Sequence, residues 1–151
     1  MTALVRPVRT DDERAWSTLY AGYRAFYRLP DDPAAVATTW AWVSSGAHGL
    51  TGLVAVDPDD RPVALANLRR FVRPSTASTG LYLDDLFTAP EVRGTGAATA
   101  LLHAAASLAA GEGATVVRWI TAADNARARR VYDAVASATP WVTYDLAPLP
   151  R

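Results

Sequence analysis

Strand-like and helix-like segments follow one another along this chain of 151 residues in an order that few folds accept. Continuous or alternating apolar runs predict strands, and apolar residues spaced by three and four predict helices. Strands are expected at residues 4–9, 50–56, 62–72, 81–88, 115–120 and 141–146, and helices at 10–28, 33–45, 97–110 and 124–136. This order predicts one mixed α/β domain over residues 1–151, with 50–56 and 62–72 paired as an antiparallel hairpin.

Composition excludes several classes of protein. The chain has no Cys, which rules out disulfides, thiolate metal sites and a cysteine nucleophile. Fifteen basic residues, all of them Arg, balance fifteen acidic residues, whereas nucleic-acid binders normally carry a basic surplus. No run approaches the roughly 20 apolar residues of a membrane span, and the N-terminus lacks the apolar core of a secretion signal. We therefore expect a cytoplasmic protein that binds neither nucleic acid nor a membrane.

A glycine-containing loop between the strand expected at 81–88 and the next helix is the first candidate site. Its sequence is Arg93-Gly94-Thr95-Gly96-Ala97-Ala98. Glycines let backbone N–H groups approach a bound group closely, and the following helix adds unpaired N–H donors and the positive end of its dipole. This combination binds phosphate, and the loop's arginine adds a positive charge. The alternative is a plain turn between strand and helix.

Two familiar nucleotide motifs do not match this loop. A dinucleotide fingerprint requires Gly or Ala where Thr99 stands and an acidic residue at the end of the next strand, which here reads Trp119-Ile120-Thr121. A P-loop requires Gly-Lys-Ser/Thr, and the chain has no Lys. The phosphate hypothesis therefore survives, whereas a Rossmann-type oxidoreductase is disfavoured.

Two adjacent carboxylates, Asp84 and Asp85, interrupt the apolar strand expected at 81–88. Side chains alternate along a strand, so one carboxylate should face each side of the sheet, and a central strand buries at least one of them. An unpaired buried carboxylate costs several kcal/mol, so such a group usually has a partner or a function. The pair is a candidate for holding a cationic amine or accepting its proton. The alternative is an ion pair with Arg, or a strand edge open to water.

Asn125 and Tyr132 are seven residues apart, so two helical turns place them on one face of the helix expected at 124–136. A tyrosine hydroxyl in a pocket can act as a general acid, although at this spacing the ring can also belong to the core. The two His residues, His48 and His103, have no metal-ligand spacing, and we expect no metal site.

These residues resemble two motifs of the GNAT superfamily of N-acetyltransferases. Residues 86–98 resemble motif A, whose Arg/Gln-x-x-Gly-x-Gly/Ala pattern is filled by Arg93, Gly96 and Ala98. Residues 119–132 resemble motif B, and one helix and one strand separate the two motifs, as in the family. The acidic pair and the aromatic N-terminal half resemble the branch of small polyamine and histone acetyltransferases and their bacterial relatives.

The resemblance implies a GNAT-like single domain, in which a mixed, mostly antiparallel sheet is flanked by helices and splayed at the acetyl-CoA site. It implies direct acetyl transfer from acetyl-CoA to an amine, without a metal. Tyr132 would protonate the leaving thiolate, and Asp84 or Asp85 would orient the amine and take its proton, directly or through water. The implied cofactor-binding residues are Leu86, Phe87 and Thr88 for the pantetheine arm, Arg93, Gly94, Thr95, Gly96, Ala97, Ala98 and Thr99 for the pyrophosphate, and Asn125.

The acidic pair favours a small, cationic amine as the acceptor. Members of the same branch pair their C-terminal strands across a two-fold axis, which implies a homodimer whose edge is Trp141-Val142-Thr143-Tyr144. Two alternatives stay open. One is a protein-amine acetyltransferase similar to the histone enzymes. The other is a CoA-binding regulatory module without turnover, which would need neither Tyr132 nor the acidic pair.

Overall fold

The computed structural model describes residues 3–151. Its strands are β1 (Leu4–Pro7), β2 (Leu50–Val56), β3 (Pro62–Arg73), β4 (Ser78–Thr88) and β5 (Val117–Arg118). Its α-helices are α1 (Glu13–Phe26), α2 (Pro33–Ser45), α3 (Ala97–Gly111) and α4 (Ala126–Val135). Within the described part of the chain, no helix is both long and apolar enough to cross a membrane.

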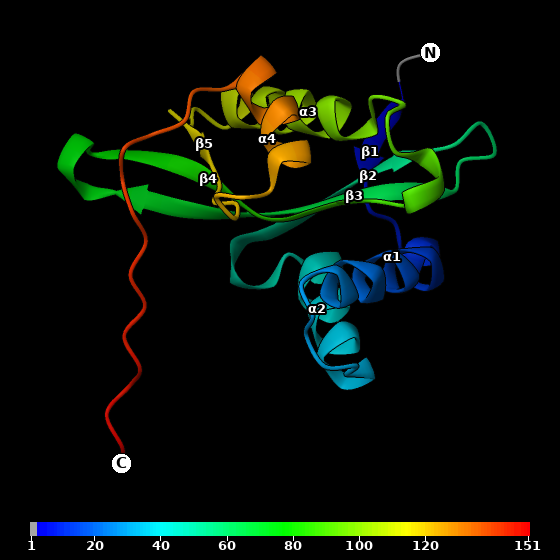
Figure 1. The fold of residues 1–151 in the computed structure, drawn as a ribbon, viewed down its shortest axis with the longest axis horizontal. Coiled ribbons are helices and arrows are strands. Elements are labelled where there is room, and N and C mark those ends of the chain that lie inside the picture. Colours follow the sequence, from blue (N-terminus) through cyan, green and yellow to red (C-terminus); the bar gives the residue numbers. More distant parts are fainter. Residues whose placement is uncertain (1–2) are drawn as a thin grey trace.

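The strands form one sheet in the order β1-β2-β3-β4-β5. The first four pair antiparallel, and β5 runs parallel to β4. Helices α3 and α4 lie on one face of this sheet, and α1 and α2 lie on the other (Figure 1). The expected mixed, mostly antiparallel sheet flanked by helices is therefore confirmed, and so is the hairpin of β2 and β3.

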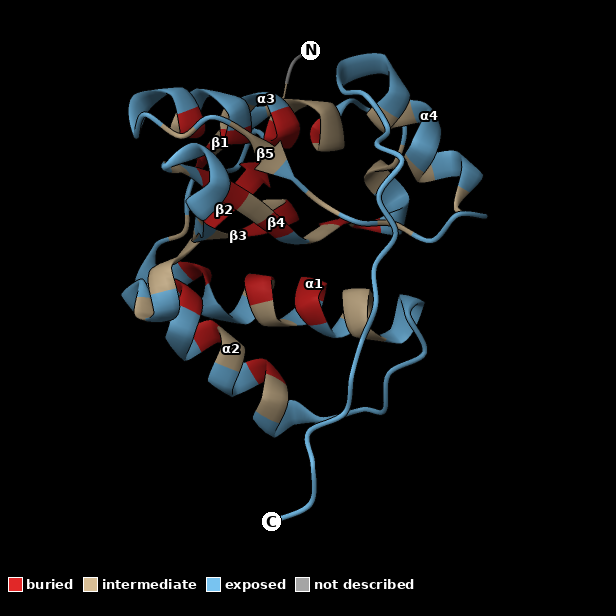
Figure 2. Cartoon of the chain, turned by 90° about the vertical axis from the view of Figure 1, so that its left-hand side faces the viewer, coloured by how far each residue is buried: buried red, intermediate tan, exposed pale blue. Residues whose placement is uncertain are grey.

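Alternation along the strands builds a separate core on each face of the sheet. On β2, Leu53 and Ala55 face the α3 side, while Val54 and Val56 face α1 and α2. Trp16 of α1 is fully buried in the second core. Figure 2 shows that the buried parts of the helices are those turned toward the sheet. Two apolar layers thus hold the central strands, including β4, in place.

The sheet opens where β4 and β5 part. The two strands pair only at Leu81 with Val117 and at Tyr82 with Arg118. The strand expected at 115–120 is thus cut to two residues, because from Trp119 the chain turns toward α4. The second half of β4, which ends at Thr88, therefore has no strand partner on that side among residues 3–151. Its backbone groups are open to a ligand, as the resemblance implied.

A β-bulge lies in the middle of β4. Asn67 of β3 pairs with Asp85, but the next residue of β3, Leu68, pairs with Leu83, so Asp84 has no opposite residue. One extra residue shifts the alternation of the side chains along the strand. Leu83 belongs to the core under α3, whereas Asp85 turns to the α1 side, where it meets Asn67.

The prediction of a strand at 141–146 is wrong. Residues 137–151 form no helix or strand, and they run away from the body of the protein (Figure 1). Trp141 is 82% exposed and Leu146 is 97% exposed. A strand needs a neighbouring strand to satisfy its backbone groups, and no strand of residues 3–151 pairs with this segment.

Candidate active site

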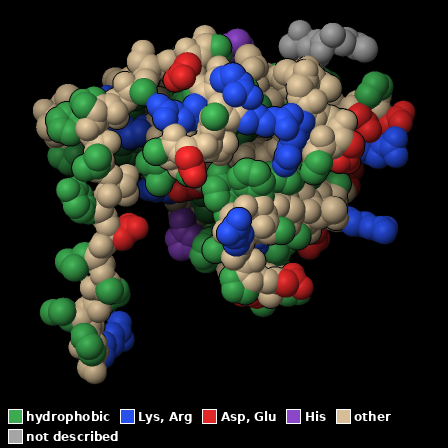
Figure 3. All heavy atoms as spheres, in the orientation of Figure 1, with side chains coloured by type: hydrophobic (Ala, Val, Ile, Leu, Met, Phe, Trp, Pro, Cys, Tyr) green, Lys and Arg blue, Asp and Glu red, His purple; other side chains and the backbone are tan. Residues whose placement is uncertain are grey.

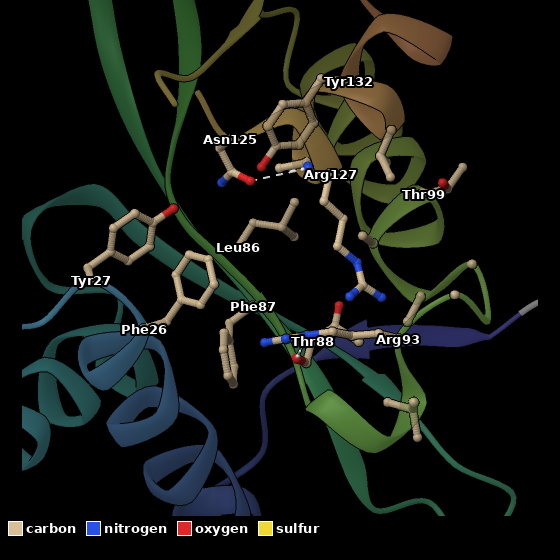
Figure 4. Close-up of a pocket in the computed structure, with 17 residues that line it drawn as sticks. Phe26, Tyr27, Leu86, Phe87, Thr88, Arg93, Thr99, Asn125, Arg127 and Tyr132 are labelled. Carbon is tan, nitrogen blue, oxygen red and sulfur yellow. Dashed lines mark hydrogen bonds between the residues drawn. The ribbon is translucent and has the colours of Figure 1, made fainter. Parts of the chain in front are cut away.

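A cavity of about 360 Å³ lies between the open half of β4, the start of α3 and helix α4 (Figure 4). It is lined by Phe26, Tyr27, Leu86, Phe87, Thr88, Val92, Arg93, Gly94, Gly96, Ala97, Ala98, Thr99, Asn125, Arg127, Ala128, Val131 and Tyr132. Every residue that the sequence assigns to cofactor binding is in this set except Thr95. The hydroxyl of Thr95 instead donates to the carbonyl of Val92, at 2.7 Å, and tightens the loop.

The glycine loop has the backbone of a phosphate cradle. Gly94 and Gly96 have φ angles of +81° and +89°, which side chains other than glycine seldom adopt. A Cβ atom at either position would meet no atom within 4 Å, so the space beside the loop is open. Gly96 is the N-cap of α3, whose first N–H groups have no carbonyl partner within the helix. The residues present therefore fit the phosphates of a CoA molecule.

Two arginines place positive charge at this loop. The guanidinium of Arg93 lies 5.8 Å and 5.6 Å from the ring centroids of Phe26 and Phe87, and its Nε donates to the carbonyl of Thr88 at 3.3 Å. Arg127 of α4 points into the same space from the opposite wall (Figure 4). Arginine side chains gather on this face of the molecule over the layer of α3 and α4 (Figure 3).

Arg127 was missed by the sequence analysis. It stands in the first turn of α4, where the helix dipole disfavours a cation and where acidic residues are absent. This unfavourable charge at a helix start is the signal that could have identified Arg127 as a ligand-binding residue. The predicted Asn125 serves the helix as well, because its Oδ1 accepts from the N–H of Ala128 at 3.3 Å. Its amide nitrogen is the group that can donate to a ligand.

A second cavity, of about 370 Å³, adjoins the first. Its lining is Tyr23, Tyr27, Leu83, Asp84, Leu86, Trp119, Ile120, Thr121, Ala122 and Tyr132. Tyr27, Leu86 and Tyr132 line both cavities, so the two spaces meet at these three side chains. The walls carry four aromatic and four aliphatic side chains, one carboxylate, and the hydroxyl of Thr121, which is buried and has no partner among the described residues.

Tyr132 stands at the junction of the two cavities. Its ring packs edge-on against Trp119, with the centroids 5.3 Å apart. Burial, with a smaller contribution from Tyr27, raises the pKa of Tyr132 to about 12. The phenol therefore carries its proton at neutral pH and has one to donate at the junction.

The two predicted carboxylates have different surroundings. Asp84 lines the second cavity and pairs with Arg69, whose Nε lies 2.9 Å from Oδ2. Asp85 lines neither cavity and faces α1. The side-chain amide of Asn67, on the neighbouring strand β3, donates to its Oδ2 at 2.9 Å. Burial raises the pKa of Asp85 despite this hydrogen bond. The ion-pair alternative therefore holds for Asp84, which is exposed, whereas Asp85 is half-buried.

Comparison with known proteins adds independent information. Residues 16–136 match the model of the acetyltransferase (GNAT) family. The chain is 27% identical over 142 residues to the D-amino-acid N-acetyltransferase HPA3 of Saccharomyces cerevisiae, an alignment that covers 93% of this chain and 88% of that protein.

Solved structures of similar fold cover nearly the whole chain. A ribosomal-protein-alanine N-acetyltransferase from Brucella melitensis biovar Abortus has a TM-score of 0.82 at 18% identity, covering 97% of this chain and 99% of the other. An aminoglycoside antibiotic 6'-N-acetyltransferase from Acinetobacter haemolyticus has a TM-score of 0.78, with the same identity and coverage. At this identity the likeness concerns the fold alone.

Proposed function

Because the chain belongs to the acetyltransferase (GNAT) family and is an N-acetyltransferase, we propose that it acetylates the amine of a small, cationic acceptor by direct transfer from acetyl-CoA. Its fold is the GNAT fold that the motifs in the sequence led us to expect. The observation that carries the proposal is the meeting of two cavities at Tyr27, Leu86 and Tyr132. One cavity suits a phosphate-bearing donor, and the other has aromatic walls and a carboxylate.

In this proposal the donor lies in the first cavity, which is therefore the donor cavity, and the acceptor lies in the second cavity, the acceptor cavity. The N–H groups at the start of α3 and the charges of Arg93 and Arg127 hold its phosphates. The open backbone of residues 86–88 bonds its pantetheine amides, and Asn125 adds a donor near the same arm. This arrangement brings the thioester to the junction of the cavities, beside Tyr132.

Transfer needs two proton movements at that junction. The amine attacks the thioester carbon through its lone pair, so a proton must leave the nitrogen. The carbon–sulfur bond then breaks, and Tyr132 gives its proton to the departing thiolate. One of the two carboxylates, Asp84 or Asp85, takes the proton of the amine, directly or through a water molecule. The products are an amide and CoA.

The second cavity favours a cationic acceptor over the alternatives. Aromatic faces attract alkylammonium groups, and four aromatic side chains line this space: Tyr23, Tyr27, Trp119 and Tyr132. The carboxylate of Asp84 adds negative charge, which its partly exposed ion pair with Arg69 offsets in part. The relative that is 27% identical to this chain is an enzyme for D-amino acids, which supports a small molecule. A protein amine, as in the ribosomal-protein enzyme and as expected of the histone branch, is the second candidate.

The test is amine-dependent release of CoA, followed with a thiol reagent. The protein has no Cys and adds no thiol background. The panel contains diamines and polyamines, D- and L-amino acids, an aminoglycoside and a basic peptide. Release with diamines or polyamines supports the proposal, and release with the peptide alone favours the protein-amine alternative. Acetyl-CoA binding without release for any amine favours the regulatory module.

The proposal also includes a homodimer. Residues 141–149 carry apolar side chains that project from the body (Figure 3), and Trp141, Val142, Tyr144, Leu146 and Leu149 are all at least 74% exposed. Exposed apolar side chains on an extended backbone favour pairing with a second chain. Light scattering of the full chain and of a chain ending at residue 140 tests this. A monomeric full chain at micromolar concentration contradicts the homodimer.

A further inference from the structure

We propose that Arg69 and Arg118 form a carboxylate-binding subsite beside the acceptor cavity, so that the acceptor carries a carboxylate at the end opposite its reacting amine. This inference rests on the proposed acetyltransferase function and names the class of acceptor that the function leaves open. The amine end is a cation, as proposed above, and the other end is an anion. The inference depends on the register of three strands and on the N–H groups of the two arginines that the fold leaves unused.

A row of three side chains crosses the sheet. Arg69 of β3 pairs with Tyr82 of β4, and Tyr82 pairs with Arg118 of β5. Residues opposite each other on neighbouring strands project from the same side of a sheet, so the two arginines flank the ring of Tyr82. Leu81 and Leu83, on either side of Tyr82 in the strand, belong to the core under α3, so the row faces the side of α1. On that side, β3 and β4 extend past α1 and α2 (Figure 1).

Aromatic rings hold both guanidinium groups. That of Arg69 lies over the ring of Tyr82, 4.4 Å from its centroid, and that of Arg118 lies over the ring of Phe71, 5.7 Å from its centroid. The two rings pack edge to face, with their centroids 6.2 Å apart. An arginine stacked on a ring has lost part of its conformational freedom before a ligand arrives, and the N–H groups at its edge can still donate.

Most of the donors of these two arginines are unused. Arg69 donates to Asp84 through Nε, and its two terminal nitrogens have no hydrogen-bond partner among residues 3–151. Arg118 forms no ion pair with any of the same residues. The side chain of Arg69 is 43% exposed, and Arg118 is exposed as well. Both guanidinium groups are therefore available to a ligand.

The charges of the row favour a single carboxylate. Within residues 3–151, Asp84 is the one acidic residue that pairs with either arginine, so two cations and one anion leave one positive charge. The whole chain has equal numbers of basic and acidic residues, so this local excess does not follow from composition. A carboxylate carries the one negative charge needed, and its two oxygens match the planar fork of a guanidinium.

The row adjoins the acceptor cavity at two points. Asp84, the partner of Arg69, lines the cavity, and so does Trp119, the residue that follows Arg118. Tyr23 of α1 also lines it, and its hydroxyl lies 3.5 Å from the carbonyl oxygen of Asp84, so the cavity reaches the side of the sheet on which the row lies.

The distance between cavity and row sets the length of the acceptor. A strand rises about 3.3 Å per residue, so Tyr82 lies roughly 7 Å from Asp84 along β4. The ammonium group of the acceptor lies between the aromatic walls of the cavity. A short aliphatic chain then brings the carboxylate at its other end to the two arginines.

The test compares three amines of equal length in the CoA-release assay. 5-Aminovalerate ends in a carboxylate, pentylamine in a methyl group and cadaverine in an ammonium group. We expect the wild type to have a KM for 5-aminovalerate about five- to tenfold lower than for pentylamine, the effect of two partly exposed charge pairs. Cadaverine should have the highest KM, because its second ammonium group meets the arginines. These differences should shrink as salt screens the charges.

Arg118→Gln should remove most of this preference. Its KM for 5-aminovalerate should rise about three- to fivefold, while its KM for pentylamine stays the same, because that acceptor has no charge for the arginine to bind. In Arg69→Gln, the KM should rise for 5-aminovalerate and fall for cadaverine. Arg70→Gln is the matched control, because Arg70 follows Arg69 in β3 but pairs with Glu112 at the end of α3, away from the row. It should keep the preference of the wild type.

Equal KM values of the wild type for the three amines, or an equal rise for all three in Arg118→Gln, would overturn the subsite while turnover still supports the proposed function. A wild type that releases no CoA with any amine overturns the proposed function. Calorimetry in the presence of CoA then decides on the subsite without turnover. Tighter binding of 5-aminovalerate than of pentylamine, lost in Arg118→Gln, supports the subsite, and equal binding of the two amines contradicts it.

Discussion

Arg69 holds the carboxylate of Asp84 with its Nε atom, which lies 2.9 Å from Oδ2 and 3.1 Å from Oδ1. Its guanidinium also lies over the ring of Tyr82, 4.4 Å from the centroid. Asp84 lines the second cavity, which the proposed function assigns to a cationic acceptor, and Arg69 offsets the negative charge on that wall. We therefore expect the ion pair to tune the affinity for the acceptor.

Replacing this arginine should improve the binding of a cationic acceptor. We expect Arg69→Gln to lower the KM for a diamine about two- to fivefold at low salt, since a partly exposed ion pair contributes about 0.2–1 kcal/mol. The effect should shrink as salt screens the charges. Arg70→Gln is the matched control, because Arg70 pairs with Glu112 at the end of α3, and neither residue lines the cavity. A higher KM in Arg69→Gln would show that the arginine itself binds the acceptor.

Tyr132→Phe should lose turnover and keep acetyl-CoA binding. Removing a general acid typically costs 100-fold or more in kcat, while the ring still fills its place against Trp119. The pKa of about 12 means that the phenol is protonated at lower pH and that its acid function is lost only as pH rises through that value. Wild-type kcat should therefore show no alkaline limb from Tyr132 below about pH 10.

The control for this prediction is Tyr82→Phe, which removes a hydroxyl from a tyrosine that lines neither cavity. Rates are measured with saturating acceptor, and acetyl-CoA affinity is measured by calorimetry. Unchanged turnover in Tyr132→Phe would contradict the prediction, because the thiolate would then take its proton from solvent or from another group.

Sequence alone was sufficient wherever the signal was local. The helix expected at 33–45 is confirmed with the same bounds as α2, and local residues mark both of its ends. Asp32 Oδ1 accepts from the N–H of Ala35 at 3.0 Å, and Gly46 has a φ of +74°. The glycine loop was recognised for the same reason, because its residue types and its place between strand and helix are adjacent in the chain. The residues around it were brought into one cavity by the fold.

Features that depend on distant partners were not predictable. The bulge at Asp84 follows from the register between β3 and β4, so the sequence could not say which carboxylate turns to the α1 side of the sheet. The early end of β5 is also a tertiary feature, because its pairing with β4 stops at Arg118 and the next residue, Trp119, packs on Tyr132 of α4. Residues 141–146 have the composition of a strand, but a strand also needs a neighbour, and no local pattern reports whether one is present.

Arg127→Gln should weaken acetyl-CoA binding. Arg127 lines the donor cavity from α4, so its loss removes a charge-assisted contact to phosphate, which corresponds to about a tenfold higher KM for acetyl-CoA. The measurement is repeated at several salt concentrations, and the slope of log KM against log salt should fall in the variant. Arg130→Gln is the control on the same helix, because Arg130 does not line the cavity. Equal effects of the two substitutions would indicate general surface charge instead of a phosphate contact.

Gly22→Ala should disturb the donor cavity from inside α1. A Cβ at this position would lie 2.9 Å from Cε1 of Phe87 and 3.0 Å from Cζ, so the ring must shift. Overpacking of this kind costs about 1–3 kcal/mol, which exceeds the roughly 1 kcal/mol that alanine gains over glycine in a helix.

Phe87 lines the donor cavity beside Arg93, so its displacement should also lower acetyl-CoA affinity. Gly111→Ala is the matched control, because Gly111 is also helical and a Cβ there meets no atom within 4 Å. Urea unfolding followed by circular dichroism should show Gly22→Ala less stable than the wild type and Gly111→Ala at least as stable. If both alanine variants are equally stable and bind acetyl-CoA equally well, the close approach of α1 to Phe87 does not shape the cavity.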